Sequence, residues 1–354
     1  MKNLIPVITG IDQALMNKTQ QRLDNLTKPP GSLGRLEELA KQICAITGEE
    51  NPRLDNKVIF TLAADHGVVE EGVSAFPQEV TAQMVYNFLK GGAGINVLAK
   101  HVGARVVVVD MGVAEEIKNQ KSKIKNFVDK KIAWGSKNFV KGPAMTKEEA
   151  IRSICAGKEV FAQEYRRAID IVGLGEMGIG NTTASSALVA CLTSTAVKTV
   201  TGRGTGLDEV GLRHKISVIQ KAIAVNKPDA KDALDVLAKL GGFEIGGLCG
   251  IALAAAEARV PVVIDGFIAS AAALLAFCLE PRIKDYLIAS HCSVERGHKI
   301  ILKHMGLKPL LDLDLRLGEG TGAALGIGLA EAAVKILTQM ATFKGAGVSE
   351  KNRV

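Results

Sequence analysis

VIFTLAADHG (residues 58–67), RVVVVDMG (105–112), DIVGLGEMG (170–178) and VPVVIDG (260–266) decide the fold of this chain. Each segment is a short apolar run, rich in β-branched residues, that leads into glycine, aspartate or histidine. Because the apolar character is continuous, the segments are typical of parallel strands in a sheet that is covered on both faces. The helical segments between them supply the crossovers. The sequence therefore predicts an α/β fold with a doubly wound parallel sheet.

Several polar residues fall where these strands end. In a doubly wound sheet, ligands bind outside the carboxyl ends of the strands. The residues at that edge are Asp65, His66, Asp110, Glu176, Asp265 and the turn 290–293. We expect one cleft to collect all of them.

Both ends of the chain are predicted to be helical. In the N-terminal part, Pro29 and Pro30 of TKPPGSLG interrupt the helical pattern. The predicted terminal helices span about 10–26, 33–47, 294–305 and 321–342, the last two following a strand near Tyr286. We predict that residues 1–50 and 294–354 form a small helical-bundle domain beside a large α/β domain of residues 51–293.

Composition narrows the class of protein. The chain has 354 residues, of which 47% are hydrophobic. It contains no uninterrupted apolar stretch of about 18 residues and no basic segment followed by a long apolar core at its start, so we predict a cytoplasmic protein without a membrane span. The six cysteines form no CxxC pair and lie mostly in apolar runs, which predicts buried structural thiols.

The formal charge of +7 does not by itself indicate a nucleic-acid partner. Lysines are spread along the chain, and their densest stretch, 118–131, is interpreted as a solvated surface or a strand edge. One tryptophan and three tyrosines offer little material for stacking on bases. A modest excess of positive charge would instead help to attract a phosphorylated small molecule.

The segment GLGEMGIGNTTASSAL, starting at Gly173, follows a strand and opens a helix. Its backbone amides and hydroxyls suit a phosphate at a helix N-terminus, with Gly178, Gly180, Asn181 and Thr182 as candidates. Two other interpretations stay open: a purely structural tight turn, and a dinucleotide site of an oxidoreductase, since the glycines fit GxGxxG. Against the second interpretation, Glu176 inside the turn would repel a pyrophosphate.

Two further segments suit a phosphate monoester. TGRGTGLDEVGLRHKI contains Gly204, Thr205 and Lys215, and backbone amides with a lysine bind such a group. In SHCSVERGHK, Ser290 and Ser293 lie at a strand-to-helix turn, where their hydroxyls cap the helix or bind the same phosphate. The first segment also fits a surface loop with a helix N-cap at Asp208.

RLGEGTGAALG (316–326) contains the best candidate for proton transfer. Glu319 lies between Gly318 and Gly320 at the start of an apolar helical stretch, and the flanking glycines let a flat ligand approach. The alternative is an acidic residue favoured by the helix dipole. Asp65 and His66 also suggest metal or acid–base chemistry, but no HxH or HxxxH pattern accompanies them, so we predict no metal and a structural role for His66.

Seven segments together resemble the nicotinate-nucleotide:dimethylbenzimidazole phosphoribosyltransferases, which make the lower-ligand nucleotide of cobalamin. The resemblance runs in order from about Lys28 to Ala333 and covers most of the chain. The segments are KPPGSLGRLEELA, ADHGVVEEGVSAFPQEVTAQMV, GEMGIGNTTASSAL, GRGTG, DGFIASAAAL, SHCSVERGHK and RLGEGTGAALG. The resemblance implies a Rossmann-like sheet, a small helical domain from both termini, no cofactor, and a homodimer in which the partner subunit completes the site.

The resemblance also implies the reaction. The substrates are nicotinate mononucleotide and 5,6-dimethylbenzimidazole, and the products are α-ribazole 5′-phosphate and nicotinate. Glu319 matches the family's catalytic base. Glu176 is assigned to stabilising positive charge in the transition state. A catalytically silent nucleotide-binding protein is the alternative from another class, and the retained Glu319 argues against it.

Other site residues are carried over by position in the motifs. Glu176, Gly178, Gly204, Lys215, Ser293 and Arg316 match residues around the nucleotide and its phosphate. Leu317 and Gly318 are expected to border the base, and the loop 74–84, with Phe76, Pro77 and Met84, to form the other wall of its pocket. Phe76 and Met84 replace polar residues that some members use, so the preferred base stays open and tolerance of related benzimidazoles or purines is expected.

Overall fold

The computed structural model describes residues 4–118 and 126–349. These residues contain one sheet of six parallel strands in the order β3-β2-β1-β4-β5-β6. The strands are β1 (Lys57–Ala64), β2 (Arg105–Gly112), β3 (Phe127–Asp129), β4 (Ile171–Met177), β5 (Val262–Ile264) and β6 (Leu287–Ala289). In this order, the connections reverse direction between β1 and β4, which is where ligands bind in open α/β sheets. The predicted doubly wound α/β fold is confirmed.

Helices occupy most of the remaining chain. They are α1 (Gln13–Asp24), α2 (Arg35–Thr47), α3 (Val80–Lys90), α4 (Gly94–His101), α5 (Lys147–Tyr165), α6 (Asn181–Leu192), α7 (Val197–Val200), α8 (Glu209–Asn226), α9 (Ala233–Leu240), α10 (Phe243–Glu257), α11 (Phe267–Leu279), α12 (Arg296–Met305), α13 (Thr321–Gln339) and α14 (Phe343–Ala346). Two 3₁₀ segments, η1 (Gly67–Glu71) and η2 (Pro281–Tyr286), complete the described elements.

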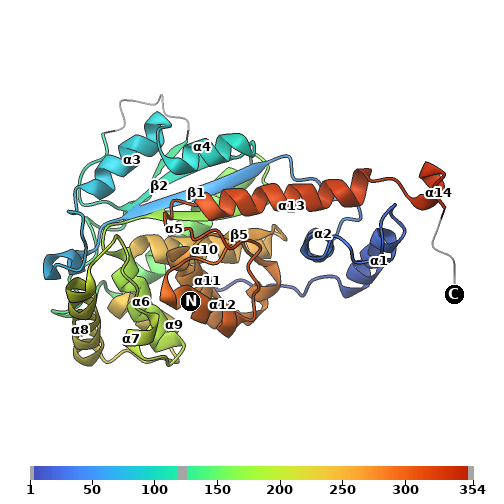
Figure 1. Cartoon of the computed structure of the whole chain (residues 1–354). Coiled ribbons are helices and arrows are strands. Elements are labelled where there is room, and N and C mark those ends of the chain that lie inside the picture. Colours follow the sequence, from blue (N-terminus) through green and yellow to red (C-terminus); the bar gives the residue numbers. More distant parts are fainter. Residues whose placement is uncertain (1–3, 119–125, 350–354) are drawn as a thin grey trace.

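The two faces of the sheet belong to two separate cores. Val58, Phe60 and Leu62 of β1 point into a core formed with α5, α10 and α11. The alternate residues Ile59 and Ala63 point into a core formed with α2, α4 and α13. Side chains of a strand alternate between faces, so both sets must be apolar when both faces are covered. Figure 1 shows α3 and α4 on one side of β1 and α10 and α11 on the other.

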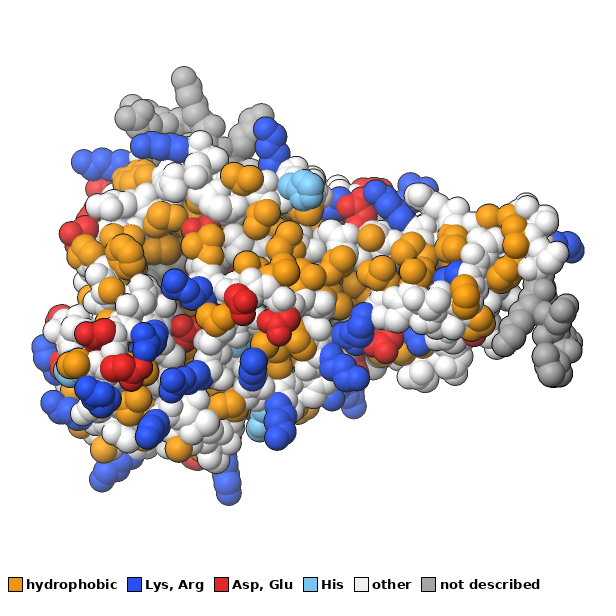
Figure 2. Space-filling view, viewed as in Figure 1, with side chains coloured by type: hydrophobic (Ala, Val, Ile, Leu, Met, Phe, Trp, Pro, Cys, Tyr) orange, Lys and Arg blue, Asp and Glu red, His pale blue; other side chains and the backbone are white. Residues whose placement is uncertain are grey.

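The terminal helices form an arm at one end of the sheet. Helix α13 begins over β4 and β5 and continues beyond the sheet, where α2 packs against it and α1 packs against α2 (Figure 1). Hydrophobic side chains are visible along this arm in Figure 2. Helix α12 packs instead on α11 and α7, within the large body. The domain boundaries at residues 50 and 294 stay a prediction.

Helices α1, α2, α12 and α13 lie within the predicted segments, with ends that differ by a few residues, whereas the short helix α14 follows the last of them and was not predicted. Strand β3 was not predicted as such, but it lies at the sheet edge within the lysine-rich stretch interpreted as a surface or a strand edge. Residues 119–125 of that stretch lie outside the described residues. The expectation of buried thiols is wrong for Cys278, which is exposed, while Cys44, Cys249 and Cys292 are buried.

One described helix, α13, is long and apolar enough to cross a membrane by length and composition. More than half of its apolar window, 56%, is buried inside the protein, and core helices of soluble proteins pass the same test. Its apolar residues face the sheet and α2. The cytoplasmic location stays a prediction.

Candidate active site

A cavity of about 370 Å³ opens at the carboxyl ends of the central strands. Its walls come from the segments that follow β4, β5 and β6, from the start of α3, and from the turn before α13. The predicted site residues that line it are Phe76, Met84, Glu176, Gly178, Asn181, Thr182, Gly204, Thr205, Ser293, Arg316, Leu317, Gly318 and Glu319. The tertiary structure thus brings the glycine-rich and serine-containing segments together with the turn 318–320.

One end of the cavity, which we call the phosphate end, is polar. Thr182 lies in the first turn of α6, where the positive end of the helix dipole favours an anion. The Lys215 ammonium lies beneath it and donates to Thr182 Oγ1 at 2.7 Å. Lys215 is buried, and burial lowers its pKa to about 8, which the nearby Glu295 carboxylate partly opposes. An incoming phosphate would favour the charged ammonium.

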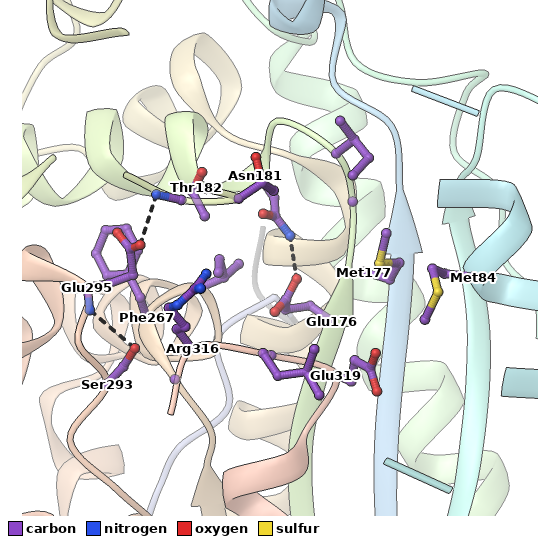
Figure 3. Close-up of a pocket in the computed structure, with 18 of the residues that line it drawn as sticks. Met84, Glu176, Met177, Asn181, Thr182, Phe267, Ser293, Glu295, Arg316 and Glu319 are labelled. Atoms are coloured by element: carbon purple, nitrogen blue, oxygen red, sulfur yellow. Dashed lines mark hydrogen bonds between the residues drawn. The ribbon is translucent and has the colours of Figure 1, made fainter. Parts of the chain in front are cut away.

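The segment around Gly204 borders this end. Gly204 has a φ of 54°, in the left-handed region. A Cβ at this position would lie 2.7 Å from Thr182 Oγ1 and 3.0 Å from Lys215 Nζ. A side chain at this position would therefore push the lysine away. Glu295 Oε1 accepts a hydrogen bond from the Gly204 amide at 2.9 Å, which fixes the segment (Figure 3).

The opposite end, which we call the base end, is apolar. Met84 and Met177 lie there, and Phe76, Val80 and Leu317 also line the cavity. Figure 3 shows Met84, Met177 and Glu319 on one side of the cavity and Thr182, Ser293 and Glu295 on the other. Half of Phe76 and 61% of Leu317 are exposed, so large apolar side chains border an open space. Such a surface suits a flat aromatic ligand.

Glu176, in β4, lies between the two ends. Its Oε2 accepts a hydrogen bond from the Asn181 side-chain amide. Burial raises its pKa to about 8, and the carboxylates of Asp265 and Glu244 add to the shift. A Cβ at Gly318, whose φ is 79°, would lie 2.4 Å from Glu176 Oε1. Glycine at position 318 therefore lets the turn approach this carboxyl group.

Glu319 is 5% exposed and lines the cavity next to the base end. Its Oε2 accepts a hydrogen bond from the Ile95 amide, in the first turn of α4, at 3.0 Å. Burial raises the pKa of Glu319 and the Ile95 amide lowers it, with a net upward shift. One carboxylate oxygen is thus held in place, and the group is poised to take a proton.

The expectation of one cleft that collects every polar strand-end residue is wrong. Asp65, His66, Asp110 and Asp265 are buried but do not line the cavity. Asp65 accepts from the Ala114 amide, His66 pairs with Glu244 at 2.8 Å, and Asp110 pairs with Lys131 at 2.8 Å. Buried polar groups need such partners, so the interior of the fold uses these residues. In residues 4–118 and 126–349, no group of three or more His, Cys, Asp or Glu could hold a metal ion.

Three other predicted site residues also lie outside the cavity lining: Pro77, Gly180 and Lys215. Lys215 lies behind Thr182, to which it donates, and next to Gly204. Gly180 is the N-cap of α6, with a φ of 95°, and a Cβ there would meet Val69 and His66. Lys215 and Gly180 thus shape the wall from behind.

The close packing of the sheet explains why glycine occupies two of the positions that fitted the dinucleotide pattern. Gly173 and Gly175 lie inside β4 rather than in the turn after it. A Cβ at Gly173 would lie 3.2 Å from Ile327 and one at Gly175 would lie 2.2 Å from the Glu319 carbonyl oxygen. Both glycines let α13 and the turn before it approach the sheet, so they do not contact a pyrophosphate in this arrangement.

Sequence reasoning missed several lining residues: Met177, Ile179, Phe267, Ile268 and Glu295. Each is adjacent to or within a segment that carried a predicted residue. Glu295 had a usable signal, since it follows Ser293 by two positions at the same strand-to-helix turn. The apolar residues had none, because an apolar residue that lines a cavity has the same pattern as one in the core.

Comparisons with known proteins show which family the chain resembles. Residues 8–348 match a family model described as phosphoribosyltransferase. A relative in Desulforudis audaxviator (strain MP104C), named nicotinate-nucleotide–dimethylbenzimidazole phosphoribosyltransferase, is 56% identical over 350 residues, which cover 99% of this chain and 98% of the relative. A relative of the same name in Geobacter metallireducens is 56% identical over 346 residues, which cover 98% and 97% of the two chains. The crystal structure of CobT from Thermus thermophilus superposes with a TM-score of 0.90 at 46% identity, covering 96% of this chain and 100% of that one.

Proposed function

The chain belongs to the phosphoribosyltransferase family, and from this membership we propose that it transfers the phosphoribosyl group of nicotinate mononucleotide to 5,6-dimethylbenzimidazole. The products would be α-ribazole 5′-phosphate and nicotinate, in the assembly of the cobalamin nucleotide loop. The observation that carries this proposal is one cavity with a polar phosphate end, an apolar base end and Glu319 beside the latter.

The nucleotide is proposed to bind with its phosphate at the phosphate end. Thr182, Thr205 and Ser293 offer hydroxyl donors, and Arg316 lines the same cavity. Lys215 supplies a positive charge from beneath Thr182. Charge-assisted hydrogen bonds of this kind are about twice as strong as neutral ones. The ribose then lies near Glu176, and the nicotinate ring lies toward the base end.

The chemistry needs a base rather than an acid. The bond between the ribose C1′ and the pyridinium nitrogen breaks, its electron pair neutralises the ring, and nicotinate leaves without a proton. One benzimidazole nitrogen forms the new bond to C1′, while the proton on the other nitrogen becomes acidic and is accepted by the Glu319 carboxylate. Attack from the face opposite the leaving ring inverts C1′ and gives the α-product.

Glu176 is proposed to stabilise positive charge that develops on the ribose. Its pKa of about 8 means that the carboxyl group of the free protein is largely protonated at neutral pH. The cationic pyridinium of the bound nucleotide favours the ionised form. An ionised Glu176 beside C1′ would then stabilise an oxocarbenium-like transition state.

We propose further that the protein works as a homodimer in which the partner subunit closes the base end. The support is the exposure of Leu317 (61%) and Phe76 (50%) at the mouth of the cavity. Large exposed apolar side chains beside a site often mark a contact surface. Light scattering would show twice the monomer mass, and a monomer that is fully active would contradict the proposal.

The experiment that tests the function is incubation of the purified protein with both substrates, followed by chromatography of nicotinate and α-ribazole phosphate. We expect both products in equal amounts. In Glu319→Gln, we expect kcat to fall by about 10²–10⁴-fold, the usual size of a lost general base. Glutamine keeps an oxygen that can accept from the Ile95 amide, so this variant separates proton transfer from the structural contact.

Glu331→Gln is the matched control, because Glu331 lies on α13 and pairs with Lys57 and Lys335 away from the cavity. We expect it to keep wild-type activity. Absence of product with dimethylbenzimidazole and with a panel of related bases would refute the function. Full activity in Glu319→Gln would refute only its role as the base.

A further inference from the structure

The turn that carries Glu319 has an unusual backbone conformation. Glu319 has a φ of 64°, in the left-handed region, between Gly318 at 79° and Gly320 at 99°. Residues with a side chain adopt this region infrequently, and they remain there only where surrounding contacts fix them. The contacts that fix this turn therefore decide where the Glu319 carboxylate lies.

Asp265 supplies three of these contacts. It follows β5 and is 1% exposed. Its Oδ2 accepts from the Gly320 amide at 3.1 Å, and its Oδ1 accepts from the amides of Gly322 and Ala323 at 2.7 and 3.2 Å. These are amides at the N-terminus of α13, which have no partner within the helix and favour a negative charge. Asp265 thus ties the turn to the end of β5.

Thr61 and Gly175 fix the other side of the turn. Thr61, fully buried in β1, donates its hydroxyl to the Glu319 carbonyl oxygen at 2.9 Å. Gly175, in β4, leaves room for the same oxygen, because a Cβ there would lie 2.2 Å from it. Three neighbouring strands therefore hold one turn. Asp265 and Thr61 do not line the cavity, so they act on the reaction through residues that do. Both contact the turn of Glu319, and the Asp265 carboxylate also raises the pKa of Glu176, an effect that Thr61 does not share.

We propose that Asp265 and Thr61 are positioning residues that clamp the Glu319 backbone in its left-handed conformation and thereby aim its carboxylate at the base. The inference rests on the proposed function of Glu319 as a base. The clamp acts on the chemical step rather than on nucleotide binding, because the phosphate end lies at the other end of the cavity.

The test compares Asp265→Asn with the wild type in steady-state kinetics. Asparagine has one acceptor oxygen and turns a donor toward an amide that also donates. We expect kcat to fall by about 10–100-fold, as for a catalytic group misplaced by about 1 Å, while the KM for nicotinate mononucleotide changes by less than about threefold. A kcat within about threefold of the wild type in the folded variant would overturn the proposal.

A double variant separates positioning from general loss of structure. If Asp265 acts through Glu319, Asp265→Asn in the Glu319→Gln background causes little further loss, whereas independent effects multiply. Asp110→Asn is the control, since Asp110 is a buried aspartate at the end of β2 that also accepts from two amides, those of Gly112 and Val113. We expect it to lower the thermal midpoint without a specific fall in kcat. Multiplied losses for Asp265→Asn would contradict the clamp.

Thr61→Val and Thr61→Ser keep the proposal testable should Asp265→Asn fail to fold. We expect Thr61→Val to lower kcat by about 3–10-fold, the loss of one hydrogen bond, and Thr61→Ser to restore it. Equal activity in the two variants would argue against the clamp. Crystal structures give an independent readout, because φ of residue 319 should stay near its wild-type value in Thr61→Ser and relax in Thr61→Val or Asp265→Asn. An unchanged turn would overturn the proposal.

These measurements distinguish a failure of the proposed clamp from a failure of the proposed function. Product formation by the wild type decides the proposed reaction. The variant ratios and the conformation of residue 319 decide the clamp, and the conformation can be determined even if the wild type makes no product.

Discussion

The two ends of the cavity are built in different ways. At the phosphate end, Thr182, Gly204 and Ser293 come from three separate segments, and hydrogen bonds with Lys215 and Glu295 hold all three in place. At the base end, the lining side chains are apolar, and their arrangement depends on packing. Hydrogen bonds fix direction, whereas apolar contacts fix shape only. The polar end should therefore discriminate strongly and the apolar end weakly.

The largest effect is expected at Glu176, which lies between the two ends. Its pKa is about 8 in the folded protein, against 4.5 as its ordinary value. Between these values the unfolded chain has released a proton that the folded protein keeps, so the free energy of unfolding falls as the pH rises. Glutamine does not ionise, so the free energy of unfolding of Glu176→Gln lacks this fall with pH. We expect its stability relative to the wild type to increase from pH 5 to pH 8 by up to about 4 kcal/mol.

Urea unfolding at several pH values between 5 and 8 measures this difference. Glu331→Gln is the control. The ion pairs with Lys335 and Lys57 hold the pKa of Glu331 below its ordinary value of 4.5, so its contribution to the free energy of unfolding does not change with pH above that value. Parallel pH curves for Glu176→Gln and the wild type would show that Glu176 ionises normally and that the middle of the cavity is wetter than the structure indicates.

The next effect tests the phosphate end alone. Lys215→Met keeps a long apolar stem but removes the charge beneath Thr182. We expect the KM for nicotinate mononucleotide to rise by about 10–100-fold, the size of a charge-assisted hydrogen bond, with a much smaller change in the KM for dimethylbenzimidazole. Initial rates with each substrate varied in turn measure both constants.

Lys221→Met is the matched control, because Lys221 is an exposed lysine on the same helix, α8. It should change neither constant. Equal rises in both KM values for Lys215→Met would mean that the two ends of the cavity are not separate.

The smallest effect is expected at the base end. Met84→Gln places an amide in the apolar wall, which can bind a polar edge of a purine. We expect the ratio of kcat/KM for adenine to that for dimethylbenzimidazole to rise by about 3–10-fold, since apolar pockets discriminate between similar shapes by modest factors. Competition between the two bases measures the ratio. A wild type that strictly accepts one base would contradict the weak discrimination predicted for this end.

Much of this arrangement could be predicted from the sequence. Continuous apolar runs predicted four of the strands, and a fifth was expected near Tyr286. Strand β3, Phe127–Asp129, lies in the lysine-rich stretch and ends in an exposed aspartate, so no continuous apolar run marked it as more than a strand edge. The segments around Thr182 and Ser293 were predicted to share a site because parallel strands end at one edge. The family resemblance added the segments around Gly204 and Glu319, and all four residues line the cavity.

The sequence could not separate residues that line the cavity from residues behind it. Asp65, Asp110 and Asp265 end strands just as Glu176 nears the end of one, and all four have similar local patterns. Whether a strand-end carboxylate faces a ligand or a backbone amide depends on which segment packs against it.

By itself, the sequence determined the parallel sheet, the edge where the site forms and the position of Glu319 between two glycines, because periodicity and glycine placement are local properties. Only the tertiary structure decided that Lys215 acts from beneath Thr182, and that Asp265 and Thr61 hold the turn at Glu319. These contacts join segments far apart in the chain. Each exists because a buried polar group needs a partner, and packing alone decides which partner is within reach.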